Sequence, residues 1–252
     1  MTGAAIAASG LGKDFGAIRA LDRLDLEVRE AEFFGFLGPN GAGKTTTVHL
    51  LATLLAPTRG TARVAGHDVA RDGLRVRRTI GLVFQETTLD RDLTVEENLR
   101  FAARLWDLPR RVAEPRIDAL LDQFGLGARR RDLVRTLSGG LRRAVDIARG
   151  ILHEPRVLFL DEPTAGLDPR ARRALWQLIG GLRAASGLTV FLTTHYVAEA
   201  EPCDRVAILD RGRLAALGTP TELKRDAAVG SLEAVFLART GHALADPGGG
   251  AG

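Results

Sequence analysis

Hydrophobic residues occur along the chain in short runs, separated by longer stretches with a helical pattern. Short apolar runs bounded by turn residues predict strands, and their alternation with helices predicts βα units around a mainly parallel sheet. The strand-like runs are Leu24–Val28, Phe33–Leu37, Thr61–Ala65, Ile80–Phe84, Val157–Leu160, Thr189–Thr193 and Val206–Leu209. Apolar and charged residues alternate in the first of these runs, so we expect a half-exposed antiparallel sheet ahead of the parallel core.

The strand signals stop between Thr94 and Ile151, where only helical patterns remain. Thr94-Val95-Glu96-Glu97 is typical of a capping box and predicts a helix through Leu105. A second helix is expected over Pro115–Phe124 and a third from Ser138. We therefore expect a helical subdomain over residues 94–151, inserted into an α/β core formed by residues 4–93 and 152–226.

Proline and glycine mark the elements of the carboxy-terminal part. Asp168-Pro169 and Thr219-Pro220 each place a capping side chain before a proline, which predicts two helix starts. Further on we expect a short helix over residues 227–239. The last residues, rich in glycine and proline, predict a disordered tail over residues 240–252.

The composition fits one large domain. The chain has 252 residues, 45% of them hydrophobic, and no apolar stretch approaches the roughly 18 residues that span a bilayer, so we expect no transmembrane segment. The net charge is +4, and only three of the 35 basic residues are lysines. We interpret the arginine excess as a compositional bias and expect no nucleic-acid surface. Cys203 is the only cysteine, which excludes an internal disulfide.

A glycine-rich stretch between the strand Phe33–Leu37 and the helical run Lys44–Leu55 matches the phosphate-binding pattern G-x-x-x-x-G-K-[ST]. Its glycines let successive backbone N–H groups face phosphate oxygens, at the positive end of the helix. Lys44 would reach the β and γ phosphates, and the Thr45 hydroxyl would bind Mg²⁺. The alternative is a chance glycine turn before a helix. The expected ATP-binding residues here are Gly38, Pro39, Asn40, Gly41, Ala42, Gly43, Lys44, Thr45 and Thr46.

Two further segments carry chemistry. The apolar run from Val157 ends in Asp161 and Glu162; in a P-loop enzyme the first acid holds Mg²⁺ and the second polarises the attacking water, although two acids can also simply cap a strand. The glycine turn Leu137-Ser138-Gly139-Gly140-Leu141 looks like a second phosphate-binding turn, or an ordinary helix start. One nucleotide pocket has no use for two such turns, whereas a site shared between two copies would use both.

The order of these motifs resembles the nucleotide-binding subunit of an ABC transporter, over nearly the whole chain. The resemblance implies an ABC ATPase domain over residues 4–237 with the fold of a P-loop NTPase: a parallel-sheet core, an N-terminal antiparallel β subdomain and an inserted helical subdomain. It implies ATP and Mg²⁺ as cofactors. It also implies two subunits facing head to tail, each ATP lying between one P-loop and the partner's turn Leu137–Leu141. Ser138 and Gly140 would then contact the γ-phosphate in trans.

The resemblance assigns the remaining roles residue by residue. Gln85 would reach the metal and the water, and with Thr45 and Asp161 would make the metal site. Asp168, in Gly166-Leu167-Asp168, would act across the dimer, although it also explains the local helix start. His195 would sense the γ-phosphate, so that the catalytic set is Lys44, Gln85, Glu162 and His195. Phe15 would stack on adenine. Leu141 stands where the family commonly has glutamine, a change expected at the dimer seam.

Three stretches, residues 85–94, 194–201 and 231–237, are similar to the daunorubicin-resistance branch of the family. That branch implies export of a drug or antibiotic through a separate ABC-2-type membrane permease, and a cytoplasmic location on the inner face of the membrane. Lipid, polysaccharide or ion export is an open alternative. A soluble ABC ATPase that handles nucleic acid is disfavoured, because the segment from Lys44 to Ser138 is too short for a long coiled-coil insertion.

Overall fold

A six-stranded sheet forms the centre of the molecule in the computed structural model, which describes residues 3–241 except the side chains of residues 183–186. The strand order is β10-β9-β3-β8-β7-β6, and only the edge strand β10 runs antiparallel to its neighbour. The strands are β3 (Phe33–Leu37), β6 (Ile80–Val83), β7 (Val157–Asp161), β8 (Thr189–Thr194), β9 (Arg205–Asp210) and β10 (Arg213–Gly218). Strands β3, β7 and β8 are buried along their whole length, as expected of the middle of a parallel sheet.

A second, antiparallel sheet precedes the core, as the alternating pattern predicts. Its order is β2-β1-β4-β5, with β1 (Ala4–Phe15), β2 (Ile18–Arg29), β4 (Arg59–Val64) and β5 (His67–Asp68). Between the two sheets lies an apolar cluster that includes α1 (Lys44–Leu51), and the ring of Phe191 at its centre lies 5.2–5.5 Å from those of Phe34, Phe36 and Phe159. This packing fixes the second sheet against the strand that leads into the glycine-rich loop.

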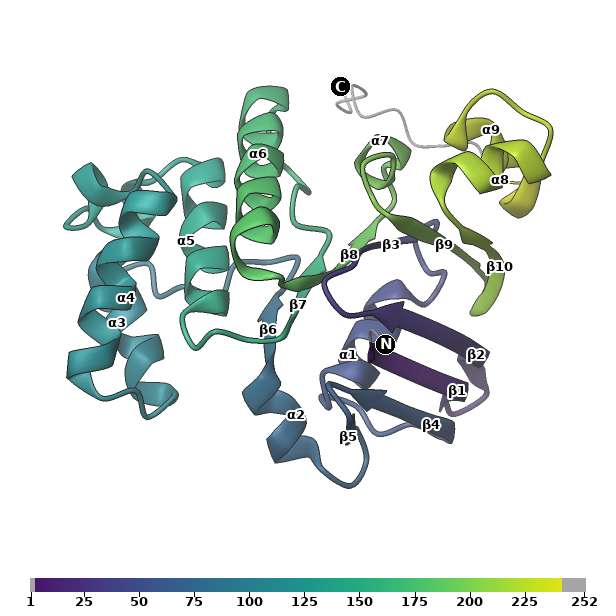
Figure 1. Ribbon diagram of the computed structural model, residues 1–252, viewed down its shortest axis with the longest axis horizontal. Coiled ribbons are helices and arrows are strands. Elements are labelled where there is room, and N and C mark those ends of the chain that lie inside the picture. The colour runs from purple at the N-terminus through teal and green to yellow at the C-terminus, as the bar shows by residue number, and fades with distance from the viewer. Residues whose placement is uncertain (1–2, 242–252) are drawn as a thin grey trace.

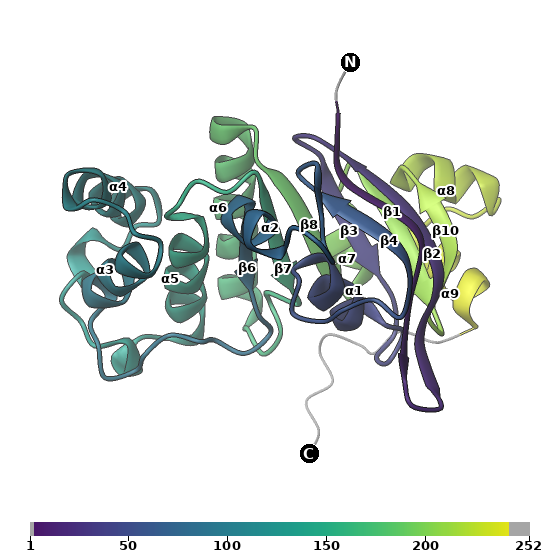
Figure 2. The same cartoon turned by 90° about the horizontal axis from the view of Figure 1, so that it is seen from below.

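Helices α3 (Val95–Leu105), α4 (Arg110–Gln123) and α5 (Gly139–Ile151) lie together at the end of the molecule away from the antiparallel sheet (Figures 1 and 2). The capping box at Thr94 is present: its hydroxyl accepts from the Glu97 N–H, and the Glu97 carboxylate accepts from the Thr94 N–H. The other helices are α2 (Gly73–Thr79), α6 (Pro169–Ser186), α7 (Val197–Ala200), α8 (Pro220–Asp226) and α9 (Leu232–Thr240).

Three expected helix boundaries are wrong. Helix α1 ends at Leu51 rather than Leu55, because Thr53 adopts a φ of 64°, which stops the helix. Helix α4 begins at Arg110, not Pro115: the Pro109 carbonyl accepts from the N–H groups of Val112 and Ala113, and a proline inside the helix removes only one further bond.

The carboxy-terminal helix is shorter at its start than expected. Ala228 has a φ of 55°, and the Ser231 hydroxyl caps α9 by accepting from the Ala234 N–H at 3.1 Å. The helix therefore covers Leu232–Thr240 rather than residues 227–239. Of the predicted tail, Thr240 belongs to α9, and residues 242–252 lie outside the described part of the chain. Within residues 3–241, no helix is both long enough and apolar enough to cross a bilayer.

Candidate active site

Three adjacent parallel strands end at one edge of the core sheet, and each continues into a segment with candidate chemistry. Strand β3 leads into the glycine-rich loop, β7 ends in Asp161 and β8 leads to His195. Ligands of open parallel sheets bind at this edge. Here it holds a cavity of about 390 Å³ lined by Ala20, Asn40, Gly41, Gly43, Lys44, Thr45, Thr46, Gln85, Glu162, Ala165 and His195.

Two glycines of the loop are required by close backbone contacts. A Cβ added to Gly43, whose φ is 106°, would lie 2.6 Å from the Ala20 carbonyl oxygen. A Cβ on Gly38 would lie 2.6 Å from the Leu209 carbonyl oxygen. Because Gly43 precedes α1 and has no side chain, no side-chain hydrogen bond caps the first N–H groups of the helix. Such a helix start is a site for an anion.

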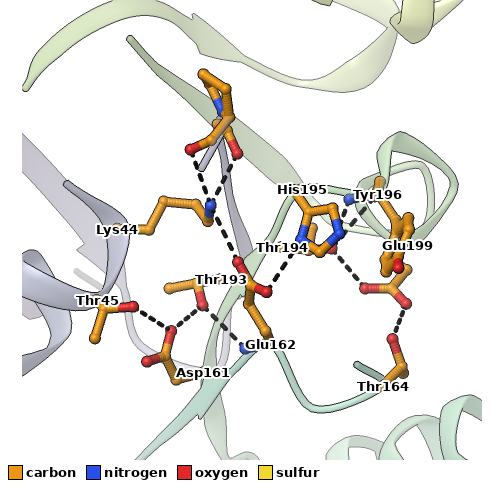
Figure 3. A network of polar contacts seen from close by, with 12 residues as sticks. Lys44, Thr45, Asp161, Glu162, Thr164, Thr193, Thr194, His195, Tyr196 and Glu199 are labelled. Atoms are coloured by element: carbon orange, nitrogen blue, oxygen red, sulfur yellow. Dashed lines mark hydrogen bonds and ion pairs between the residues drawn. The ribbon is translucent and has the colours of Figure 1, made fainter. Parts of the chain in front are cut away.

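Lys44 lines this cavity and is 5% exposed. Its ammonium donates to the carbonyl oxygens of Gly38 at 2.9 Å and Pro39 at 3.2 Å, and lies 3.1 Å from Glu162 Oε1 (Figure 3). These three acceptors match the three donors of an ammonium group. The lysine is thus held at the loop with its charge beside an acid.

Glu162 links this lysine to the histidine. Its Oε2 lies 3.0 Å from His195 Nδ1, and its backbone φ of 45° is uncommon for a residue other than glycine. Burial raises the pKa of Glu162, but the hydrogen bond from His195 and the charge of Lys44 outweigh burial and hold the pKa below its usual value. The carboxylate is therefore ionised at neutral pH, as a group that accepts a proton must be.

Asp161, next to Glu162 in the chain, is buried and contacts two threonines. Thr193 Oγ1 donates to Asp161 Oδ1 at 2.5 Å and accepts from the Glu162 N–H at 3.1 Å, while Thr45 Oγ1 lies 3.4 Å from Asp161 Oδ1 (Figure 3). Among the described residues no three His, Cys, Asp or Glu side chains gather to hold a metal by themselves. A carboxylate beside a hydroxyl nevertheless suits Mg²⁺, which takes few protein ligands and completes its shell with phosphate oxygens and waters.

The turn Leu137–Leu141 lies outside this cavity, in a second hollow of about 490 Å³ between α5 and α6. Ser138, Gly140, Leu141 and Asp168 line it, and the two linings share no residue in the described part of the chain. The Asp168 carboxylate accepts from the Ala171 and Arg170 N–H groups, both at 2.9 Å, and these bonds lower its pKa. The candidate residues therefore form two separate groups on one chain.

Two further expected residues are Phe15, which lines neither hollow, and Leu141, which lines the second hollow and also packs against the core. The Phe15 ring is 46% exposed at the end of β1, with Lys13 Nζ 5.2 Å from its centroid, and it does not line the cavity of the glycine-rich loop. Leu141 is partly buried and packs against the apolar cluster that joins the helices to the core sheet. Its side chain therefore has a local packing partner as well as a place in the second hollow.

Several residues of the site were missed by sequence reasoning. Thr193 and Thr194 end a buried strand next to His195, and that position was the available signal. Arg143 is buried on α5 and donates to the carbonyl oxygens of Phe84, at 2.6 Å, and Gln85. A charged residue in a helix gives no sequence signal of burial, so this link between α5 and Gln85 emerges only in the structure.

The phosphate loop between β3 and α1, with the acidic end of β7 beside it, defines a P-loop ATPase that carries an inserted group of helices. The chain belongs to the ABC transporter family, whose model matches residues 21–165. It is an ATP-binding subunit of this family and an ATP hydrolase, and the predicted fold class is confirmed.

Known relatives agree with this assignment. The chain is 50% identical to the daunorubicin/doxorubicin resistance ATP-binding protein DrrA of Streptomyces peucetius, over 87% of this chain and 67% of that protein. It is 42% identical to the Nod factor export ATP-binding protein I of Ralstonia nicotianae, over 86% and 68% respectively. A solved structure titled as an ATP binding subunit of an ABC transporter superposes with a TM-score of 0.82, at 31% identity, over 92% of this chain and 98% of that one.

Proposed function

We propose that this chain binds and hydrolyses ATP with Mg²⁺ as a head-to-tail dimer, and so powers export through a separate ABC-2-type membrane permease. The observation that carries this proposal is the division of the motif residues. Lys44, Glu162 and His195 meet in one cavity, whereas Ser138 and Asp168 lie in another. A second copy that apposes the two hollows would complete each site.

Phosphate binding follows from the loop geometry. The γ-phosphate would compete with Glu162 for the Lys44 ammonium and release the carboxylate toward the water, since both bind at the same charged group. Thr45, Gln85 and Asp161 would hold Mg²⁺, which neutralises charge on the β and γ phosphates when bound. Phe15 would stack on the adenine ring from the end of β1.

Hydrolysis would use the acid that the fold keeps ionised. Glu162 would accept the proton of the water that attacks the γ-phosphorus, while the bond to the bridging oxygen breaks and ADP leaves with that oxygen. His195, held 3.0 Å from Glu162, would contact the γ-phosphate and keep the carboxylate aligned. The partner's Ser138 hydroxyl and the backbone N–H groups of its Gly139–Gly140 turn would stabilise the transferred phosphoryl group from the other side.

The permease would dock in a groove between the core and the inserted helices. This groove, of about 460 Å³, is lined by apolar residues that include the exposed Phe101 and Leu105 of α3, together with Phe84 beside Gln85. Arg143 on α5 donates to the carbonyl oxygens of Phe84 and Gln85. A displacement of α5 would therefore move the segment that carries Gln85, and the reverse. This docking would place the chain on the inner face of the cell membrane.

The name of the Streptomyces peucetius relative supports a drug or antibiotic as cargo. The Ralstonia nicotianae relative, named for Nod factor export, supports a second candidate, a cargo that is not a drug. Vesicles that contain the chain with its permease would separate the two: ATP-dependent uptake of an anthracycline into inverted vesicles supports drug export, and its absence supports another cargo.

The experiment that tests the ATPase assignment is E162Q, compared with E154Q as a control on an exposed glutamate at the other end of β7. We expect E162Q to bind ATP, to remain dimeric with ATP and to hydrolyse it about 10²–10⁴-fold more slowly, the usual contribution of a general base. E154Q should match the wild type. Wild-type turnover in E162Q would refute the role of Glu162.

A further inference from the structure

Glu199 is a buried acid that belongs to none of the motifs described above. It lies in α7, just past His195, and is 3% exposed. Both carboxylate oxygens are bonded: Oε1 accepts from the Thr164 hydroxyl and Oε2 accepts from the Thr194 hydroxyl at 2.6 Å (Figure 3). The side chain thus joins two segments that are distant in sequence.

The two threonines flank the reacting pair. Thr164 follows Glu162 by two residues, and Thr194 directly precedes His195. Thr194 Oγ1 also accepts from the Tyr196 N–H at 2.9 Å, which fixes the backbone on the far side of the histidine. Glu199 therefore connects the loop that carries the carboxylate to the loop that carries the imidazole.

The connection continues to α6. Arg172, in the second turn of that helix, places Nε 3.9 Å from Glu199 Oε1 and its guanidinium carbon 4.7 Å from the centre of the Tyr196 ring. The Tyr196 ring centre lies 4.0 Å from that of His195. Asp168 caps the same helix one turn earlier, so α6 connects this cluster to the second hollow.

Burying a carboxylate costs free energy that hydrogen bonds and a nearby cation offset only in part. Burial raises the pKa of Glu199 against the opposing effect of the two threonine bonds and Arg172. Glu199 does not line the cavity of the glycine-rich loop, so direct contact with the nucleotide does not account for it. Its geometry is that of a brace between two loops.

We propose that Glu199 is a positioning residue for hydrolysis, which holds the Thr164 and Thr194 segments so that Glu162 and His195 stay in register. The inference rests on the proposed function of that pair. Reaction geometry is sensitive to displacements of about 1 Å, which can cost up to ~10²-fold in rate. Loss of the brace should therefore slow turnover while ATP binding, which depends on the glycine-rich loop, is retained.

The test compares E199A and E199Q with E201A, since Glu201 lies two residues on, is exposed and pairs with Lys224 at 2.9 Å. E199A should lower kcat about 10–100-fold with KM for ATP within about twofold. E199Q can bond both threonines through its amide and should stay within about threefold of the wild type. E201A should be unchanged. Wild-type kcat in E199A, or a fall in E199Q as large as in E199A, would overturn the inference.

A double-mutant cycle separates positioning from general destabilisation. The loss of kcat in the double variant E199A and H195A, expressed as a free energy, should be smaller than the sum of the two single losses, because part of the effect of Glu199 acts through His195. Additive losses would show a merely structural role. If E199A does not fold, T164V removes one bond at nearly constant volume and should lower kcat about fivefold by the same route; an unchanged kcat would overturn the inference. Fully active E162Q and H195A would instead refute the proposed function itself.

Discussion

The two groups of motif residues on this chain differ in how deeply they are buried and in which polar contacts their side chains make. In the P-loop group Lys44, Asp161 and Glu162 are buried, and all three side chains have hydrogen-bond or ion-pair partners within the chain. In the other group Ser138 and Asp168 are exposed, and each accepts hydrogen bonds from N–H groups in the first turn of its own helix. The contrast indicates that the P-loop group is held in place by contacts within the chain, whereas the second group lies at two exposed helix starts.

Removing the lysine should have the largest effect on this comparison. K44A deletes the cation that faces both the loop carbonyls and Glu162, so ATP affinity should fall strongly and turnover should drop by at least about 10²-fold. Equilibrium nucleotide binding and a phosphate-release assay measure both. K224A, which breaks an exposed pair with Glu201, is the control and should behave as the wild type. Wild-type ATP affinity in K44A would contradict the assigned phosphate contact.

Arg143 tests whether the two groups are coupled within one chain. R143K keeps the charge but cannot reproduce the forked donation to the carbonyl oxygens of Phe84 and Gln85. We expect kcat to fall about tenfold with ATP affinity preserved, since the proposed role of Gln85 is in the reaction, whereas that of the glycine-rich loop is in phosphate binding. R142K, on the neighbouring position of α5, is the matched control. Equal kcat in the two variants would show that Arg143 only stabilises the helix.

Leu141 should give a smaller effect, confined to the exposed group. L141Q restores the residue type common in the family but places an amide against an apolar cluster, so unfolding free energy should fall by about 1 kcal/mol. The affinity of the monomer for ATP should be unchanged, because Leu141 does not line the P-loop cavity. Urea unfolding and nucleotide titration check the two statements. A loss of ATP affinity in the L141Q monomer would contradict the assignment of Leu141 to the group away from the P-loop.

The smallest expected effect concerns pH, where Glu199 and Asp168 should act in opposite directions. Burial raises the pKa of Glu199 above its ordinary value of 4.5, so its contribution to stability is largest below that value and falls as pH rises through the folded pKa. Backbone hydrogen bonds lower the pKa of Asp168 below 3.8, so its contribution is present above 3.8 and is lost as pH falls through the folded pKa.

Urea midpoints from about pH 3 to pH 8 measure this contrast. Relative to the wild type, E199Q should gain stability as pH rises, whereas D168N should lose most at neutral pH and approach the wild type in acid. Slopes of the same sign for the two variants would contradict the pKa directions.

The sequence predicted the strands that end beside the glycine-rich loop, because strand runs that end in glycine or acid mark the sheet edge where β3, β7 and β8 meet. It missed strand β1 and the edge strand β10, which carry glycines and small residues instead of long apolar runs. It also missed Glu199 and Arg143, since nothing in a helical pattern shows that a charged side chain is buried. Pattern reasoning finds elements and motifs, whereas the polar contacts between them depend on packing.

The central claim is that each ATP site is shared between two chains, and chemical cross-linking tests it directly. Asn40 in the glycine-rich loop and Ser138 in the turn Leu137–Leu141 are both exposed, and the native Cys203 is buried, so cysteines introduced at the first two positions would be the reactive ones. N40C and S138C would each be made in the E162Q background, mixed, and treated with a short bismaleimide in the presence of ATP and Mg²⁺.

We predict a covalent dimer of the two chains in the mixture with ATP, little of it without ATP, and little with either variant alone. A mixture that gives no ATP-dependent dimer would contradict the shared site. So would a chain with both N40C and S138C that stays at monomer mass after the same treatment.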